Sequence, residues 1–327
     1  MKTTFAAVYN AYGTPSQEVN YSEINLEEMG ETQVLVKFLR AVINPSDMGM
    51  IGGSYGTLKK LPAVAGREGI GQIEAVGKNV CSLKVGDIVR MPPEQGAWRE
   101  YCVADADSLY SVPEGVDYDA ACMAFINPPT ALRVLRDFCG LKEGDWIIQN
   151  GASSALGYFM IQLCAERKIN TINMLRNAKE REKALKDIGA TVVVDEAEFD
   201  YKKIRATYPL PKLGLNQIGG NSVSNMIKVM ADSGTVVTVG GMTGEPVRFP
   251  TRFLIFNDLR LRGFWWDKWQ RIHTKDEIQK VLDEIFGYIK AGKLKAPVSA
   301  RFQLKDIKEA LKVAAMSQRG GKVVITR

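Results

Sequence analysis

The sequence predicts an α/β protein in which a doubly wound parallel sheet is inserted into a β-rich domain. Before about residue 125, short apolar or alternating segments are divided by Gly, Pro and Asp, which is typical of β-strands. After that point, helical segments alternate with short β segments, which indicates a parallel sheet with helices on both faces. The last segment is too small to form a domain, so we expect it to rejoin the first one. The predicted domains are residues 1–124 with 268–327, and residues 125–267.

The β-rich domain is expected to contain short strands and, at its carboxyl end, two helices. The strands are predicted at 5–9, 33–44, 69–76, 88–91, 97–103 and 322–326. The segment from Thr274 to Glu277 has the capping-box pattern that begins a helix. A shorter helix is predicted at 304–316.

The inserted domain is expected to alternate strands with helices. Its strands are predicted at 146–149, 171–175, 191–195, 213–218, 235–240 and 259–266. Its helices are predicted at 129–138, 155–167, 179–188 and 222–230.

Residues 145–176 carry the clearest functional pattern. An apolar strand runs into a turn bounded by Gly151 and Gly157, and a helix and a second strand follow. This unit places a dinucleotide pyrophosphate at a helix N-terminus, where unpaired N–H groups and the helix dipole favour anions. The turn departs from the usual fingerprint at Ala155, which stands where the second glycine is expected. The methyl group of Ala155 narrows the approach to the pyrophosphate.

The residue after the second strand bears on which dinucleotide would bind. NAD-binding units usually carry Asp or Glu about 20 residues beyond the loop, to hold the ribose hydroxyls. Here the chain has Arg176 and Asn177, with Lys179 and Arg181 close by. An arginine at this place would accept the 2′-phosphate of NADP. The alternative at this point is a helix N-terminus with solvated charges.

Composition narrows the class of protein. The hydrophobic fraction of 46% and the charged fraction of 24% are ordinary for a globular protein, and no apolar run is long enough to span a bilayer. Residues 1–10 have no signal-peptide or transit-peptide character, so we expect a cytoplasmic location in a bacterium, with a mature form whose leader is missing as the alternative. The net charge of +6 is spread along the chain, which suits phosphate-bearing or acidic substrates better than nucleic acid.

Cysteine and histidine are used sparsely. The five cysteines form no CxxC pair, so we expect reduced thiols rather than disulfides or a zinc lobe. The one histidine, His273, lies just before a predicted helix, where a surface role is the ordinary interpretation. A site with several histidine ligands is impossible, and no metal site is predicted.

Several strings in the sequence resemble a known superfamily. They are INPSD at 43–47, GSY at 53–55, LPAV at 61–64, VCSLKVGD at 80–87, IQN at 148–150, VGGM at 239–242 and LIFNDLRLRGFWW at 254–266. Together they resemble the medium-chain dehydrogenase/reductase superfamily over essentially the whole chain. Within it, the chain is similar to the zinc-free 2-enoyl thioester reductases of the mitochondrial type. The resemblance implies a Rossmann domain inserted in a GroES-like catalytic domain.

The zinc ligands of the superfamily are replaced. Its zinc enzymes carry Cys where this chain has Asn44, and His where it has Arg67. Catalytic zinc is therefore not expected. Reduction of an activated C=C bond needs no metal, because a neighbouring carbonyl already makes the β-carbon electrophilic.

The resemblance implies a reaction and a proton donor. Hydride would pass from NADPH to the β-carbon of a trans-2-enoyl-CoA or enoyl-ACP of fatty acid synthesis, and a proton would then reach the α-carbon. Tyr55 matches the tyrosine that the reductases use as donor. With a reference pKa of about 10, tyrosine stays protonated at neutral pH. Related quinone reductases also place a tyrosine near here, so an NADPH:quinone oxidoreductase or enone reductase is the alternative function. A cofactor-binding protein with a structural or regulatory role is a third possibility.

The resemblance also implies cofactor contacts and a partner. The residues that match these contacts are Asn127, Ser153, Ser154, Ala155, Leu156, Arg176, Asn177, Ala178, Gly240, Gly241, Met242, Phe264, Trp265, Trp266 and Lys322. Two alternatives stay open: the Trp-rich run could be core packing, and Lys322 could be simply solvated. A homodimer is expected, with the strand at 259–266 as the sheet edge that pairs.

Overall fold

The computed structural model describes residues 2–317 and 319–327. The chain divides into two compact units. The first consists of residues up to Ile126 together with Leu282–Lys290 and Ala296–Arg327, and the second of Asn127–Val281 with Ala291–Lys295. Helix α10 (Trp266–Arg271) and the first turns of α11 (Lys275–Lys290) therefore belong to the second unit.

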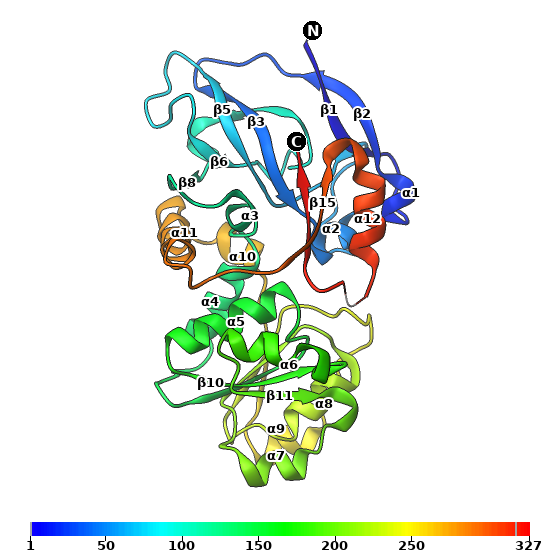
Figure 1. Cartoon of the computed structure of the whole chain (residues 1–327), viewed down its shortest axis with the longest axis vertical. Helices are drawn as coiled ribbons and strands as arrows, with labels where there is room; N and C mark the ends of the chain where they lie inside the picture. The colour runs from blue at the N-terminus through cyan, green and yellow to red at the C-terminus, as the bar shows by residue number, and fades with distance from the viewer. Residues whose placement is uncertain (1, 318) are drawn as a thin grey trace. The chain divides into compact units, whose positions relative to one another are not determined.

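The first unit contains two β-sheets (Figure 1). The small sheet has the strand order β2–β1–β4, and the larger, seven-stranded sheet has the order β15–β16–β3–β5–β6–β8, with β7 paired to β3. The strands are β1 Lys2–Tyr9, β2 Asn20–Leu26, β3 Gln33–Val42, β4 Ala63–Val64, β5 Gly69–Val76, β6 Ile88–Arg90, β7 Tyr101–Asp105, β8 Ser111–Val112, β15 Val298–Gln303 and β16 Lys322–Thr326. The chain thus returns after the second unit to add β15 and β16 to the first.

Short helices connect these strands. They are α1 Pro15–Glu18, α2 Pro45–Ile51, η1 Ala106–Ser108, α3 Tyr118–Ala121, η3 Leu304–Asp306 and α12 Ile307–Ala315. Helix α2 begins where Asp47 accepts a hydrogen bond from the backbone N–H of Asn44 at 2.7 Å, and Pro45 supplies a preset φ at the first turn.

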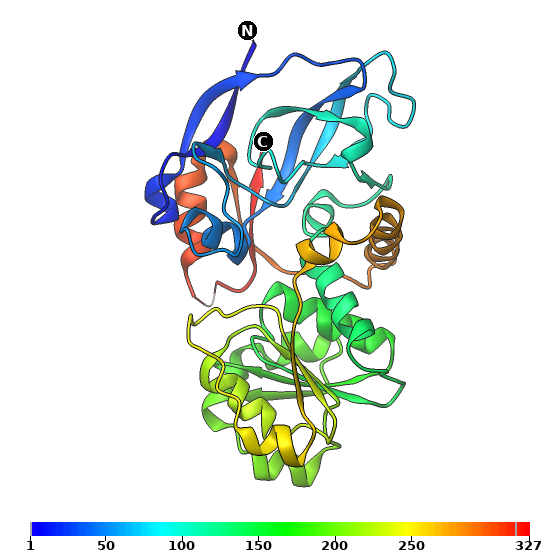
Figure 2. The ribbon, with the colours of Figure 1, turned by 180° about the vertical axis from the view of Figure 1, so that it is seen from behind.

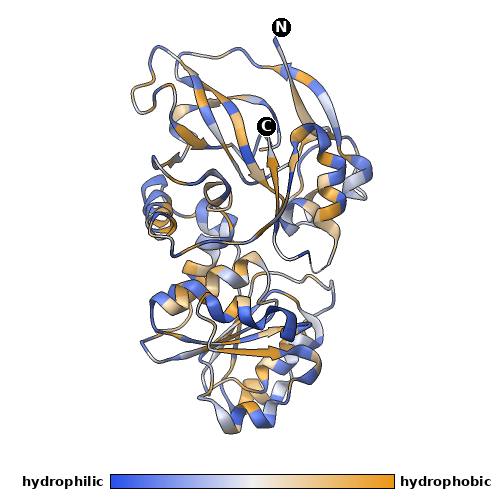
Figure 3. Ribbon diagram, in the orientation of Figure 1, coloured by the Kyte–Doolittle hydropathy of each residue, from blue (hydrophilic) through white to orange (hydrophobic). Residues whose placement is uncertain are grey.

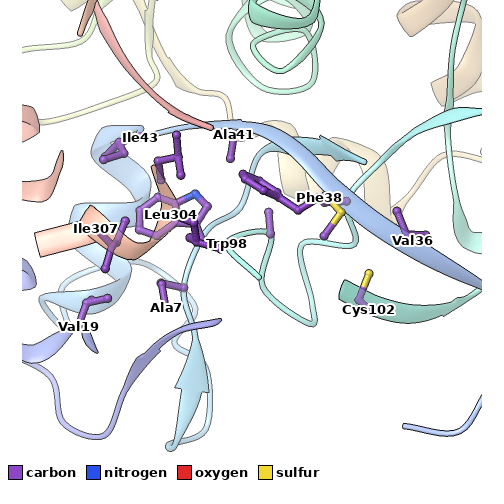
Figure 4. Close-up of a cluster of buried hydrophobic side chains, with 14 of the residues drawn as sticks. Ala7, Val19, Val36, Phe38, Ala41, Ile43, Trp98, Cys102, Leu304 and Ile307 are labelled. Carbon is purple, nitrogen blue, oxygen red and sulfur yellow. The ribbon is translucent and has the colours of Figure 1, made fainter. Parts of the chain in front are cut away.

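The core of the first unit is built around Trp98, which is fully buried (Figure 4). Leu304 and Ile307 from the returning segment lie beside it, together with Ile43 and Ala7. Segments from both ends of the chain therefore share one core. Truncation of such a buried tryptophan to alanine typically destabilises a protein by about 3–5 kcal/mol.

The second unit is a doubly wound α/β structure. Its sheet has six strands in the order β11–β10–β9–β12–β13–β14, and every neighbouring pair is parallel. The strands are β9 Trp146–Gln149, β10 Asn170–Leu175, β11 Val192–Asp195, β12 Leu213–Asn216, β13 Thr235–Thr238 and β14 Arg260–Gly263. The strand order reverses between β9 and β12, and ligands of such sheets bind at this point. The predicted fold class is confirmed.

Helices cover both faces of this sheet. In Figure 1, α4 and α5 lie above it and α7, α8 and α9 below it. The helices of the unit are α4 Asn127–Asp137, α5 Ala155–Glu166, α6 Ala178–Asp187, η2 Glu196–Glu198, α7 Tyr201–Thr207, α8 Gly220–Ile227, α9 Thr251–Phe256 and α10. Figure 3 shows the strands of the sheet mainly in the hydrophobic colour and the outer helix surfaces mainly in the hydrophilic one. This pattern is expected when a parallel sheet is buried on both faces.

Several elements differ from the sequence prediction. The strand predicted at 259–266 ends at Gly263, and Trp266 instead begins α10, because aromatic residues favour strands without requiring one. The strand predicted at 97–103 is displaced, since β7 spans Tyr101–Asp105. Strands β2 and β15 and helix α9 were not predicted. The capping box of α11 is confirmed, as Thr274 N donates to Glu277 Oε2 at 2.8 Å and Glu277 N to Thr274 Oγ1 at 3.3 Å.

Candidate active site

A buried polar cluster lies in the first unit behind the Asn44 loop. Glu68 is fully buried, and its carboxylate accepts hydrogen bonds from Asn44 Nδ2 at 2.7 Å and from the backbone N–H groups of Phe125 and Ile126, both at 2.8 Å. These are the two residues before α4, which begins at Asn127. Lys322 Nζ completes the cluster by donating to Asn44 Oδ1 and to Ile43 O at 3.3 Å.

Burial opposes the charged forms of this cluster. It raises the pKa of Glu68, and the charge of Lys322 and the hydrogen bond from Asn44 act in the opposite direction. Burial likewise lowers the pKa of Lys322 to about 8, against the attraction of Glu68. The structure therefore places Lys322 inside the first unit, where its ammonium group binds the Asn44 loop. Its predicted cofactor contact stays a prediction.

Tyr55 lies on the loop after α2 and is held by a buried arginine. Arg67 Nη1 donates a hydrogen bond to Tyr55 Oη at 2.7 Å, and the guanidinium carbon lies 4.6 Å from the centroid of the tyrosine ring. Both distances fall within the range of favourable interactions. Arg67 is only 8% exposed, whereas Tyr55 is partly exposed. The phenol group of Tyr55 is thus partly exposed at the surface of the unit, and the buried guanidinium of Arg67 binds its oxygen.

Asp47 lies close to this pair. It is 1% exposed, and burial raises its pKa to about 6, while the hydrogen bond from Asn44 and the charges of Arg67 and Lys322 act in the opposite direction. Within the described residues, Asp47 Oδ1 has no hydrogen-bond partner. Asp47 and Arg67 line one small cavity together with Tyr9 and Lys59.

The predicted phosphate turn lies in the second unit at the start of α5. Ser154 caps this helix by accepting a hydrogen bond from Gly157 N at 3.0 Å. Gly151 has a φ of 60°, in the left-handed region, and a Cβ on Gly157 would lie 2.4 Å from Ala152 O. Both glycines are therefore required by the backbone. Ser153 is exposed, Ser154 and Ala155 are partly exposed, and Leu156 is buried.

Buried amide side chains connect this turn to β12. Asn150 Nδ2 donates to Asn216 Oδ1 at 2.8 Å, and Asn150 Oδ1 accepts from Gln217 N at 2.7 Å. Gln217 Nε2 donates to Asn150 O at 3.0 Å, while Gln217 Oε1 accepts from Ser154 Oγ at 2.7 Å. None of these three residues, Asn150, Asn216 and Gln217, is among those predicted for the site. Polar side chains directly after the apolar strand β12 were the signal, because ligands bind at the carboxyl ends of parallel strands.

Residues 240–242, which follow β13, also contact Gln217. Met242 N donates to Gln217 O at 3.2 Å, and a Cβ on Gly240 would lie 3.0 Å from that oxygen. Gly241 has open space beside it, and the side chain of Met242 is 62% exposed. The structure therefore brings the phosphate turn and residues 240–242 together around Gln217.

Arg176 follows β10 with an exposed side chain, and Asn177 has a left-handed φ of 54°. The backbone N–H of Ala178 donates to Asp195 Oδ2 at 2.8 Å, which lowers the pKa of that carboxyl group. The first amide of α6 is thus already satisfied by protein. The Arg176 side chain is an exposed cation at this strand end, and its predicted cofactor contact, like those of Asn177 and Ala178, stays a prediction.

The three aromatic residues after β14 differ in exposure. Phe264 packs edge-on against Phe138, with ring centroids 6.0 Å apart, and Trp265 is partly exposed. Trp266 is 3% exposed and stacks on Trp269 at 4.9 Å. Core packing accounts for Trp266, as the alternative interpretation of this run allows. Its predicted cofactor contact, like those of Phe264 and Trp265, stays a prediction.

Comparisons with known proteins agree with this architecture. The family described as "Alcohol dehydrogenase GroES-like domain" matches residues 30–114, and the family described as "Zinc-binding dehydrogenase" matches residues 155–286. The chain is 39% identical to the mitochondrial enoyl-[acyl-carrier-protein] reductase of Rattus norvegicus over 94% of this chain and 85% of the relative. The human enzyme of that name is 37% identical over 98% and 88%. The chain belongs to this family of enoyl reductases within the medium-chain dehydrogenase/reductase superfamily.

Solved structures are similar over their full lengths. The complex of Etr1p with NADP and crotonyl-CoA has a TM-score of 0.90 and 27% identity, covering all of both chains. The mitochondrial 2-enoyl thioester reductase Etr1p/Etr2p heterodimer from Candida tropicalis has a TM-score of 0.89 and 28% identity, again over both whole chains. A mycobacterial quinone oxidoreductase has a TM-score of 0.85 at 24% identity, over 99% of this chain and 100% of that one, which shows the shared fold alone.

The names of these relatives correct the predicted location of the protein. The expected cytoplasmic location is wrong, because the similar enoyl reductases are named mitochondrial. The name of the second matching family mentions zinc, yet residues 2–317 and 319–327 contain no cluster of three or more His, Cys, Asp or Glu able to hold a metal ion. No helix in the described part of the chain has the length and apolarity to cross a membrane.

Proposed function

We propose that this protein reduces the C=C bond of trans-2-enoyl thioesters with NADPH. The observation that carries the proposal is its 37–39% identity, over nearly its whole length, to proteins named enoyl-[acyl-carrier-protein] reductase. A solved relative of the same fold holds NADP and crotonyl-CoA. The quinone reductase alternative rests on a similarity that reaches only the fold.

The second unit fits a dinucleotide phosphate. The partly exposed start of α5 offers N–H groups at a helix N-terminus, and the left-handed Gly151 and the close approach of Gly157 to Ala152 shape the turn before it. We assign pyrophosphate binding to Ser153, Ser154, Ala155 and Leu156. When bound there, NADPH supplies the hydride that adds to the β-carbon of the substrate.

Arg176 is the residue that we assign to the 2′-phosphate of NADPH. Its exposed guanidinium follows β10, and the carboxylate of Asp195, at the end of the neighbouring strand β11, already accepts hydrogen bonds from the backbone N–H groups of Ala178 and Ala197. A guanidinium forms short, charge-assisted bonds to phosphate. Asn177 and Ala178 belong to the same turn, whereas Gly240, Gly241 and Met242 follow β13, which pairs with β12.

We assign proton donation to Tyr55. Negative charge develops on the carbonyl oxygen and α-carbon of the thioester as its β-carbon is reduced. The O–H bond of the phenol breaks, a C–H bond forms at the α-carbon, and the electron pair stays on Tyr55 Oη. Solvent then returns a proton to the phenolate. The products are the saturated thioester and NADP.

The proposed function also includes the group that carries the enoyl chain and the oligomeric state of the protein. We assign acyl carrier protein or coenzyme A as the carrier of the enoyl group. We also propose a homodimer formed through β14, the edge strand of the six-stranded sheet, whose four residues are all exposed. Figure 2 shows the yellow segment that includes β14 on the near side of the second unit. Leu254, Ile255 and Phe256 of α9, just before it, are also exposed.

A substrate panel tests the proposal. Purified protein is mixed with NADPH and either crotonyl-CoA or a benzoquinone, and loss of the nicotinamide absorbance is followed, with NADH as the paired control. We expect turnover with crotonyl-CoA and a preference for NADPH. Turnover of the quinone alone would disprove the thioester assignment, and tight NADPH binding without turnover of either compound would favour a non-enzymatic role.

A further inference from the structure

The contact between Arg67 and Tyr55 gives the reductase a buried cation at its proton donor. Arg67 Nη1 donates to Tyr55 Oη at 2.7 Å, so the guanidinium uses an acceptor site of the phenol oxygen. We propose that Arg67 is a positioning residue that stabilises the negative charge left on Tyr55 Oη when Tyr55 gives up its proton. This inference rests on the proposed function, in which Tyr55 is the donor.

The backbone holds Arg67 in place. Gly66, directly before it, has a φ of 92°, and a Cβ there would lie 2.3 Å from Cδ1 of the buried Trp98. On its other side, Glu68 is bonded to Asn44 and to two backbone amides. Arg67 therefore extends from a short segment that is fixed at both neighbouring residues, which limits the entropy lost when its side chain binds Tyr55.

The charged groups around Arg67 come from several elements. The acidic Asp47 of α2 and the basic Lys59 from the loop before β4 interact with Arg67. Glu68 is the next residue in the chain, and Lys322 of β16 acts on both Asp47 and Glu68. Glu94 and Arg99 also act on the charge of Lys59. Burial is the main cause that lowers the pKa of Lys59 to about 8, and the charge of Arg67 contributes to this lowering. Arg67 itself remains cationic, because a guanidinium is not deprotonated in proteins.

A permanent cation at this position acts differently on the two forms of Tyr55. A guanidinium can only donate, so it binds the phenol oxygen through a lone pair. The same bond becomes charge-assisted once the oxygen carries a negative charge, and such bonds are roughly twice as strong as neutral ones. Arg67 therefore favours the state that follows proton transfer over the state that precedes it. Interactions of this kind accelerate a chemical step.

The ionisation of Tyr55 in the free protein tests this inference without cofactor or substrate. Tyrosine labelled with ¹³C at Cζ is titrated by NMR, and Tyr55→Phe identifies the signal. In Arg67→Met we expect the ionisation of Tyr55 to move up by about 1–2 pH units, as for loss of an adjacent opposite charge. In Arg67→Lys, which keeps the positive charge, we expect the ionisation of Tyr55 to move up by less than in Arg67→Met.

A matched arginine controls for general effects on the fold. Arg99 is also partly buried in the first unit, but it donates to Tyr101 O at 3.0 Å and to Gln95. Arg99→Met should leave the Tyr55 signal in place. If Tyr55 ionises at the same pH in folded Arg67→Met as in the wild type, the inference is wrong, even where activity falls. Absence of crotonyl-CoA turnover in the wild type would instead refute the proposed function.

A kinetic measurement separates charge stabilisation from substrate and cofactor binding. In Arg67→Met we expect kcat to fall about 10–100-fold, which is less than the roughly 10²–10⁴-fold contribution of a whole acid–base group, because Tyr55 is still present. The Kd for NADPH, measured by fluorescence, should stay within about twofold of the wild-type value, because the charge that Arg67 stabilises develops only during proton transfer. A loss confined to the Kd would contradict the inference.

Discussion

Ser154 Oγ donates a hydrogen bond to Gln217 Oε1 at 2.7 Å and accepts one from Gly157 N at 3.0 Å. The hydroxyl hydrogen of the helix cap is thus directed into the protein, toward the end of β12. The orientation of the phosphate turn therefore depends on a residue of another strand. Any phosphate at this turn would be bound chiefly by backbone N–H groups.

Gln217→Ala should weaken NADPH binding by about tenfold, because it removes the bonds to Ser154 and Asn150, and one net hydrogen bond contributes about 1 kcal/mol. Isothermal titration of the variant with NADPH measures the change. Gln162→Ala is the matched control, since Gln162 is also a buried amide of this unit but bonds to Lys295 O at 2.7 Å. An equal loss of affinity in both variants would indicate general destabilisation rather than positioning of the turn.

Arg176→Ala should remove the preference for NADPH over NADH. Loss of a charged hydrogen bond to the 2′-phosphate costs about 1.5–3 kcal/mol, which corresponds to a 10–100-fold loss for NADPH. NADH lacks this phosphate, so its kcat/KM should change little. The ratio of the two kcat/KM values is the measurement, and Lys179→Ala, at an exposed residue in the first turn of α6, is the control. An unchanged ratio in Arg176→Ala would show that another residue selects the cofactor.

Local patterns predicted the parts of the site that lie close in sequence. Gly151, Ser154 and Gly157 fall in one strand–turn–helix unit, and Arg176 directly follows the next strand. The helix start and the strand end are both specified within a few residues, so periodicity and small residues are sufficient to find them.

Contacts between distant residues could not be predicted in this way. Gln217 is 63 residues from Ser154, and Lys322 is 278 residues from Asn44. A lone lysine near the end of a chain is most often solvated, so nothing local indicates that Lys322 is buried. Trp266 shows the same limit, because an aromatic run does not reveal which of its rings faces the core.

Asp47→Asn should flatten the pH dependence of stability in mildly acidic solution. Burial raises the pKa of Asp47 from 3.8 to about 6, so between these values the folded state binds more protons than the unfolded state. Stability from this group is therefore complete below pH 3.8 and is lost as the pH rises through about 6. The contribution of Asp47 to the free energy of unfolding changes by at most about 1.4 kcal/mol per pH unit.

Urea unfolding at several pH values between 4 and 7 compares Asp47→Asn with the wild type. Asparagine keeps an oxygen for the backbone N–H of Asn44 but cannot ionise, so the wild type should lose stability relative to the variant as the pH rises. Asp87→Asn is the control: its partly exposed carboxylate accepts a hydrogen bond from Lys84 N at 2.9 Å in a surface turn. Parallel pH profiles for Asp47→Asn and the wild type would contradict the burial argument.

Leu261→Pro should convert the proposed dimer to a monomer without disturbing its own sheet. Arg260 N donates to Gly234 O at 2.9 Å, and backbone groups alternate in direction along a strand, so Leu261 N points away from β13. Proline removes that outward donor, which pairing across the edge would use. Light scattering after gel filtration should show the mass halved, with cooperative unfolding retained. Val85→Ser, at another exposed apolar residue, should leave the mass unchanged. A dimeric Leu261→Pro variant would place the interface on another surface.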